Sequence, residues 1–119
     1  MNMKVIIGGA LALALGLALK SAGAELVSSP EAHALVAGGA ALVDVRTSEE
    51  FADGHIEGAM NIPVDELSKR LAEVGPKSRP VVVYCQSGGR SRAAAQTLRD
   101  AGFTQVRDLG AMKRWRESK

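Results

Sequence analysis

The stretch PVVVYCQSGGRSRAAAQTLRDAG, residues 80–102, decides the fold class because it contains a strand, a tight turn and a helix in succession. Residues 81–84 are four consecutive large residues, three of them β-branched, which is typical of a strand buried on both faces of a parallel sheet. A helix is expected from about Arg90 onward. Three apolar residues then share one face of that helix, namely Ala94, Leu98 and Ala101.

The rest of the chain from residue 25 alternates short strands and helices in the same way. Further strands are expected near residues 41–45, 59–62 and 104–110, and helices near residues 29–38, 48–53, 65–75 and 112–119. Ser29 is expected to cap the first helix, and Thr47 with Glu50 forms a capping box for the second. Asp65 is a candidate cap for the third. This alternation predicts one small α/β domain with a mainly parallel sheet flanked by helices.

The first 24 residues have the pattern of a secretory signal peptide. A short basic start precedes the uncharged apolar run Val5–Leu19, and the small residues Ala22 and Ala24 stand at the A-x-A cleavage positions. A retained membrane anchor is the less favoured alternative, because a span needs about 20 apolar residues. We therefore expect residues 1–24 to be a signal peptide removed after Ala24, and residues 25–119 to form the domain of a periplasmic or otherwise exported protein.

Charge is balanced over residues 25–119 but unevenly distributed along them. Residues 25–75 contain three basic and ten acidic residues, net −7, whereas residues 76–119 contain ten basic and three acidic residues, net +7. The overall balance argues against a protein that binds nucleic acid or, once the signal is removed, an anionic membrane surface. The positive half is either a solvated face or a field that attracts an anionic substrate.

Cys85 is the only cysteine in the chain and lies at the end of the strand predicted at residues 80–85. Exported proteins normally pair their cysteines in disulfides, and a single cysteine has no internal partner. A working thiol is therefore favoured over inert packing. Reactive sites in parallel sheets lie at the carboxyl ends of the strands, which is where Cys85 stands.

The loop that follows Cys85 is suited to holding an anion. Gly88 and Gly89 permit positive φ and allow successive N–H groups to turn inward as a nest. The N-terminus of the next helix adds partial positive charge, and Arg90 adds a full one. These features favour thiolate over thiol, so we expect the pKa of Cys85 below its reference value of about 8.5. Cys85 is thus the candidate nucleophile of a covalent reaction.

Four motifs in order along the chain resemble those of the rhodanese (sulfurtransferase) family. They are LVDVRTSEEF (residues 42–51), GHIEGAMNIP (54–63), the active-site loop VVVYCQSGGRS (81–91) and the closing segment DLGAMKRW (108–115). The resemblance covers nearly all of residues 25–119 and is to the small exported single-domain type. The sequence departs from the family at Gln86 and Gly89, where charged or bulky residues are frequent.

The resemblance implies a thiosulfate sulfurtransferase. In such enzymes a sulfane sulfur passes from thiosulfate to the cysteine, and the cysteine persulfide passes it to a thiophilic acceptor such as cyanide. Position by position, the resemblance implies that Cys85 is the nucleophile and that Arg90 stabilises the anion and braces the loop. It also implies substrate contacts, largely through backbone N–H groups, at Gln86, Ser87, Gly88, Gly89, Ser91 and Arg92. It implies no metal and no cofactor.

Arg46 and Asp44 lie at the end of the strand predicted at residues 41–45. Arg46 either contacts substrate or pairs with Glu50 or another acid at the strand end, and we expect the structural role. Asp44 is expected to be buried and hydrogen-bonded in the same turn, because an unpaired buried carboxylate is costly.

Three ring residues have less defined roles. His55 is expected to form a hydrogen bond within its turn rather than to act as an acid or base. His33 shows no visible partner in the sequence. Trp115 either lines the pocket or packs in the core.

Three alternatives to a small-molecule sulfurtransferase use the same residues. A persulfide carrier would dock a protein sulfur acceptor and show little turnover alone. A phosphatase or arsenate reductase loop has five residues between cysteine and arginine, whereas four separate Cys85 from Arg90, a ring that suits one sulfur better than a tetrahedral oxyanion. A catalytically inactive interaction module is disfavoured because both residues are present.

Overall fold

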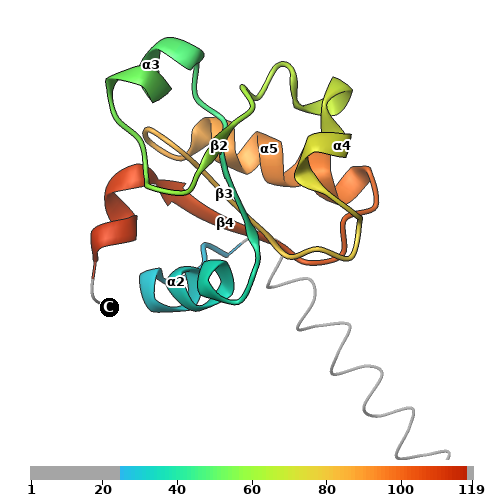
Figure 1. The fold of residues 1–119 in the computed structure, drawn as a ribbon, viewed down its shortest axis with the longest axis horizontal. Coiled ribbons are helices and arrows are strands. Elements are labelled where there is room, and N and C mark those ends of the chain that lie inside the picture. Colours follow the sequence, from blue (N-terminus) through green and yellow to red (C-terminus); the bar gives the residue numbers. More distant parts are fainter. Residues whose placement is uncertain (1–24, 118–119) are drawn as a thin grey trace, which may run out of the picture.

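The computed structural model describes residues 25–117, in which four parallel strands form one sheet in the order β2-β1-β3-β4 (Figure 1). The strands are β1 (Ala41–Asp44), β2 (Met60–Asn61), β3 (Val81–Cys85) and β4 (Val106–Ala111). β3 pairs with β1 on one side and with β4 on the other. The predicted α/β fold with a parallel sheet is confirmed. The proposed signal peptide, residues 1–24, lies outside the described residues.

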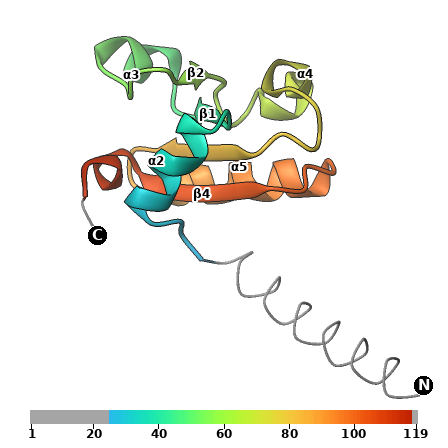
Figure 2. The ribbon, with the colours of Figure 1, turned by 60° about the horizontal axis from the view of Figure 1, so that its bottom comes forward.

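Helices cover both faces of the sheet. On one face lie α5 (Gly89–Asp100), α4 (Leu71–Val74) and the 3₁₀-helix η1 (Leu67–Lys69), and on the other lie α2 (Ser29–Ala37) and the 3₁₀-helix η2 (Met112–Arg116). Figure 2 shows α2 and α5 on opposite sides of the sheet. The remaining helix, α3 (Ser48–Asp53), follows the carboxyl end of β1. The loop that follows Cys85 and the segment that leads into α3 therefore both begin where central strands end.

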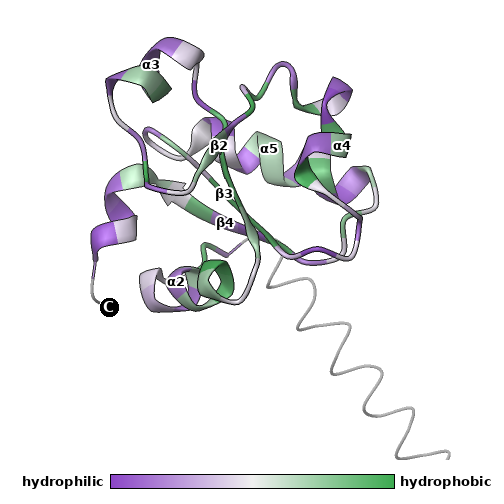
Figure 3. Ribbon diagram, viewed as in Figure 1, coloured by the Kyte–Doolittle hydropathy of each residue, from purple (hydrophilic) through white to green (hydrophobic). Residues whose placement is uncertain are grey.

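The central strand β3 supplies side chains to two hydrophobic cores in alternation, as the pleat of a strand requires. Val81, Val83 and Cys85 belong to the core under α5, whereas Val82 and Tyr84 belong to the core under α2. None of these five side chains is more than 1% exposed. Figure 3 shows β3 as hydrophobic and η2 as mostly hydrophilic. The pleat thus points Cys85 toward the side of the sheet that α5 covers.

The capping box predicted for α3 is present. The Thr47 side chain accepts a hydrogen bond from the Glu50 N–H (3.1 Å), and the Glu50 carboxylate accepts one from the Thr47 N–H (3.0 Å). The continuous helix predicted from Asp65 is instead divided into η1 and α4, because the backbone leaves helical dihedral angles at Arg70 (φ −124°, ψ 25°). Segments this short have little stability of their own. The core holds their apolar residues, Leu67, Leu71 and Val74.

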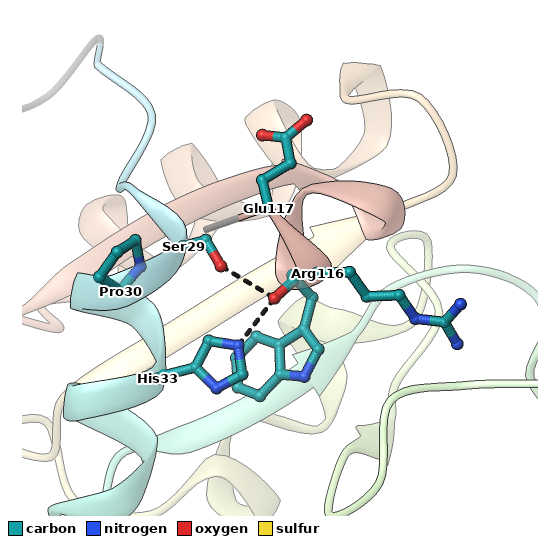
Figure 4. Close-up of a pocket in the computed structure, with 6 residues that line it drawn as sticks. Ser29, Pro30, His33, Arg116 and Glu117 are labelled. Carbon is teal, nitrogen blue, oxygen red and sulfur yellow. Dashed lines mark hydrogen bonds between the residues drawn. The ribbon is translucent and has the colours of Figure 1, made fainter. Parts of the chain in front are cut away.

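α2 and η2 are joined at one carbonyl oxygen. The Ser29 hydroxyl donates to the Trp115 carbonyl (2.8 Å), and His33 Nε2 lies 2.7 Å from the same oxygen (Figure 4). The His33 ring also stacks on the Trp115 indole, with ring centroids 3.6 Å apart. The prediction that Ser29 caps α2 was wrong, because Ser28 caps it by accepting from the Glu31 N–H (3.3 Å). The sequence showed no partner for His33 because its partner, Trp115 in η2, is distant in sequence.

A buried ion pair closes the carboxyl end of β1. Asp44 is 0% exposed and Arg46 is 3% exposed. Arg46 Nε and Nη2 bind the two carboxylate oxygens of Asp44 at 2.7–3.1 Å, and Nη2 also donates to the Gly54 carbonyl (2.7 Å). The side-chain amide of Asn61 donates to the backbone carbonyls of Asp44 and Arg46 (3.0 Å each). Arg46 is structural here, as expected, and its partner is Asp44 rather than Glu50.

Replacing Arg46 by alanine should lower the free energy of unfolding by about 3–5 kcal/mol, because the Asp44 carboxylate would stay buried without its cation. Thermal unfolding followed by circular dichroism measures the loss. Arg70→Ala, which removes surface ion pairs with Glu66 and Glu73, is the matched control and should lower Tm much less. An Arg46→Ala protein with unchanged Tm and no activity would assign Arg46 to the catalytic site instead.

Candidate active site

The loop between β3 and α5 is short and contains one left-handed residue. β3 ends at Cys85 and α5 begins at Gly89, with Gly88 as its N-cap. Gly88 has φ 114° and ψ −23°, a backbone conformation that strongly favours glycine. Of the two glycines that permit positive φ, only Gly88 adopts it, because Gly89 is already the first residue of the helix. The single turn at Gly88 is enough to direct the following N–H groups back toward Cys85.

The Cys85 sulfur accepts hydrogen bonds from two backbone N–H groups. The Gly88 N–H lies 3.0 Å from Sγ, and the Ser91 N–H lies 3.3 Å from it. The Ser91 hydroxyl donates to the Gly88 carbonyl (3.1 Å), which ties the loop to the first turn of α5. Cys85 is 1% exposed and Ser91 is 0% exposed. The sulfur is therefore solvated by peptide groups rather than by water.

These hydrogen bonds determine the ionisation of the thiol. Burial raises the pKa of Cys85, but hydrogen bonds from the Ser91 side chain and from the N–H groups of Ser91, Gly88 and Ser87 outweigh burial and lower the pKa. The Ser91 hydroxyl has one proton, so it reaches the sulfur only by leaving the Gly88 carbonyl. The backbone N–H groups are therefore the constant donors. Cys85 is a thiolate over a wider pH range than an ordinary cysteine.

Arg90 is held at the rim of the loop by Glu50 of α3. Nη1 donates to Oε1 (2.7 Å) and Nη2 to Oε2 (3.0 Å). Bonds from Arg90 and then from Thr47 lower the pKa of Glu50 to about 2, so this carboxylate is charged at neutral pH. The Arg90 side chain is 37% exposed, which leaves the guanidinium accessible to an anion. The sequence did not identify Glu50 as a site residue. Its capping box with Thr47 is visible in the sequence, but its ion pair with Arg90 is not.

The other predicted substrate contacts lie on the outside of the loop. Gln86 and Ser87 are exposed, and Gln86 Oε1 accepts a long hydrogen bond from Arg46 Nη1 (3.5 Å). Arg92 is exposed on the first turn of α5, and its side chain makes no hydrogen bond to another residue within 25–117. The structure thus groups Cys85 with the loop N–H groups, places Arg90 at the rim and leaves Arg92 farther along the helix.

A pocket of about 550 Å³ borders the loop at Gln86. The residues that line it are Gly54, His55, Ile56, Glu57, Gln86, Met112, Lys113, Trp115 and Arg116. Trp115 lines this pocket and also packs against the core under α2, so both of its expected roles are present. His55 Nδ1 lies 2.8 Å from the Phe51 carbonyl, and its ring stacks on Phe51 at 3.6 Å, which is the turn role expected for it.

Within residues 25–117, no group of three or more His, Cys, Asp or Glu side chains is placed to hold a metal ion. None of the helices in that range is long and apolar enough to cross a membrane.

The sequence model of the rhodanese-like domain matches residues 28–118, and the chain belongs to this family. YqhL of Bacillus subtilis, an uncharacterised protein, is 48% identical over 77 residues, which are 64% of this chain and only 60% of YqhL. The thiosulfate:glutathione sulfurtransferase of Homo sapiens is 41% identical over 111 residues, covering 81% of this chain and 96% of the human protein. The solved structure of the human single-domain sulfurtransferase TSTD1 is similar with a TM-score of 0.71 and 39% identity, covering 81% of this chain and 98% of that one. The human enzyme and the TSTD1 structure support a rhodanese-type sulfurtransferase.

The pH dependence of alkylation by iodoacetamide should have a midpoint below about 8.5, the reference value for cysteine, because the pKa of Cys85 is lowered. Ser91→Ala should move this midpoint to higher pH, because it removes the hydroxyl whose hydrogen bond lowers the pKa of Cys85. It also removes the hydrogen bond that ties the Gly88 carbonyl to α5. Ser87→Ala keeps its backbone N–H and is the matched control. An alkylation profile of Ser91→Ala identical to that of the wild type would show that the hydroxyl only holds the loop in place and does not lower the pKa of Cys85.

Proposed function

We propose that the chain is a thiosulfate sulfurtransferase that carries a sulfane sulfur as a persulfide on Cys85 and gives it to a thiophilic acceptor such as cyanide. The observation that carries the proposal is the position of Sγ, which accepts N–H bonds from Gly88 and Ser91 at the start of α5. Donors that stabilise a thiolate there also stabilise the charged sulfur of a persulfide. The human relative, whose name specifies thiosulfate, supports this donor.

Two displacements at sulfur complete the proposed cycle. The Cys85 thiolate attacks the outer sulfur of thiosulfate, the S–S bond of thiosulfate breaks, and sulfite leaves with the bonding electron pair. Cyanide then attacks the outer sulfur of the persulfide, thiocyanate leaves, and Cys85 returns as a thiolate. No oxidant, metal or proton is consumed. The loop N–H groups from Gln86 to Ser91 would stabilise the transferred sulfur, and Arg90 and Arg92 would attract the anionic donor.

The alternative of a phosphatase is not supported by the site. A phosphatase needs an acid to protonate the leaving group. Among residues 25–117, the carboxylate that contacts the rim is Glu50, and its pKa of about 2 and its two-point bond to Arg90 keep it deprotonated. The four-residue spacing from Cys85 to Arg90 also favours a single sulfur atom.

Incubation of the purified protein with thiosulfate should add the mass of one sulfur atom to the intact protein, and Cys85→Ser should abolish the gain. Arg90→Ala should slow the uptake on the order of tenfold to a hundredfold, because a charge-assisted contact contributes about 1.5–3 kcal/mol. Arg99→Ala, on the same helix, is the matched control. A wild-type protein that gains no sulfur from thiosulfate would refute the proposed donor.

A persulfide carrier is the second candidate, and the same preparation distinguishes it from the enzyme. Rapid production of thiocyanate from thiosulfate and cyanide by the isolated chain indicates an enzyme. Sulfur uptake without such turnover indicates a carrier that needs a protein acceptor. Cyanide is small enough to reach a sulfur that is buried in this loop, so we expect turnover without a partner.

We also propose export, with cleavage after Ala24, on the basis of the apolar run and the small residues before the cleavage position. N-terminal sequencing of the periplasmic or secreted protein should then begin at Glu25. Recovery of the protein in the membrane fraction with Met1 still present would contradict this proposal.

A further inference from the structure

The side-chain hydroxyl of Ser91 has two acceptors near it. It donates to the Gly88 carbonyl (3.1 Å), while the backbone N–H of the same residue lies 3.3 Å from Cys85 Sγ. Burial raises the pKa of Cys85, and the Ser91 side chain is the strongest of the hydrogen-bond donors that lower it. Ser91 is 0% exposed, so water does not compete for the hydroxyl. A hydroxyl has one proton, and it therefore serves the carbonyl or the sulfur, one at a time.

The loop allows the hydroxyl to leave the carbonyl without stranding it. The Gly88 carbonyl also accepts the helical hydrogen bond from the Arg92 N–H (3.1 Å). A carbonyl oxygen accepts two hydrogen bonds, so this one remains when the hydroxyl turns away. The N–H groups of Gly88 and Ser91, in contrast, are fixed by the backbone at the start of α5. The hydroxyl can thus change acceptor by rotation of its side chain while the peptide donors stay in place.

The charge on Sγ changes in opposite directions in the two displacements of the proposed cycle. In the first, which loads the protein with sulfur, the Cys85 thiolate is the nucleophile and its charge decreases. In the second, which releases the sulfur, Sγ is the leaving group and its charge returns. An interaction accelerates a step only when it is stronger in the transition state than in the ground state. A hydrogen bond to Sγ therefore assists release and does not assist loading.

We propose that the Ser91 hydroxyl is a catalytic group of the release step, which donates to the Gly88 carbonyl while sulfur is bound and turns to Sγ as the sulfur leaves. This inference rests on the proposed function. A lone pair of the acceptor forms the new bond to the outer sulfur, the S–S bond of the persulfide breaks, and its electron pair goes to Sγ. The hydroxyl then hydrogen-bonds to Sγ and keeps its proton. Cys85 leaves as a thiolate, and no further reactant is required.

Single-turnover kinetics of the two displacements test this role. Loading is followed by intact mass after rapid mixing with the sulfur donor, and release by the thiocyanate formed when the loaded protein is mixed with cyanide. Both are measured at a pH where alkylation of Cys85 has reached its plateau, so that the thiol is ionised in every variant. Ser91→Ala should slow release about tenfold and change loading less than about twofold, as expected for one hydrogen bond to a charged atom.

Two further variants separate this role from support of the loop. Thr97→Ala removes another hydroxyl on α5, which donates to the Ala93 carbonyl (3.1 Å), and it should leave both rates unchanged. Ser91→Thr retains a hydroxyl and should keep the wild-type ratio of release rate to loading rate. A damaged loop would slow both steps and leave this ratio unchanged. The inference is overturned if the ratio in Ser91→Ala equals that of the wild type, or if the ratio in Ser91→Thr falls as far as in Ser91→Ala.

The choice of sulfur donor separates failure of this inference from failure of the proposed function. Inorganic polysulfide also gives sulfane sulfur to a thiolate, so both rates are measured with polysulfide as well as with thiosulfate. A wild-type protein that takes sulfur from polysulfide but not from thiosulfate would refute the proposed donor. The ratio of the two rates in the polysulfide series would still support or overturn the role of Ser91.

Discussion

The structure depends on one interaction, in which the buried sulfur of Cys85 accepts hydrogen bonds from peptide N–H groups. An ionised group that is buried without compensation is unstable. Here the compensation comes from peptide N–H groups, which the turn at Gly88 directs toward Cys85. That turn can form only because β3 ends and α5 begins within four residues. The central strand, the helix and the glycine between them therefore serve the same purpose.

The two arginines near the loop each form an ion pair with a different carboxylate. Arg46 is bound to Asp44 in the interior, and Arg90 is bound to Glu50 at the rim. Each cation already has its own acid, so neither forms a direct ion pair with the thiolate. This leaves the peptide groups as the principal partners of the sulfur, and it keeps Arg90 in a fixed position with its guanidinium still accessible. The site therefore combines fixed peptide N–H groups around the sulfur with the Arg90 cation at the rim of the loop.

The sequence was sufficient for those parts of the fold that depend on local chemistry. The run of β-branched residues at Val81–Val83 predicted the central strand because such side chains are stable on a sheet that is covered on both faces. The capping box of Thr47 and Glu50 was visible because both of its hydrogen bonds form within four residues. The inward N–H groups followed from a strand, a glycine turn and a helix in succession.

The sequence could not show the contacts that only tertiary packing decides. Asp44 and Glu50 lie two and four residues from Arg46, and nothing in the spacing shows which acid pairs with Arg46 or that Glu50 binds Arg90. His33 was left without a partner because η2 lies at the other end of the chain. The pocket that η2 forms with the turn at 54–57 was invisible for the same reason. Only the folded chain brings Lys113, Arg116 and Glu57 around one space.

The burial of Cys85 also determines which molecules can exchange disulfides with the protein. With the side chain 1% exposed, the sulfurs of two copies cannot approach to the bond length of about 2.05 Å that a disulfide requires. The protein without a bound sulfur is thus shielded from cross-linking even though the pKa of its thiol is lowered. In the proposed persulfide, the second sulfur would lie about 2 Å from Sγ. An acceptor that takes this sulfur attacks the outer atom and therefore need not reach Sγ itself.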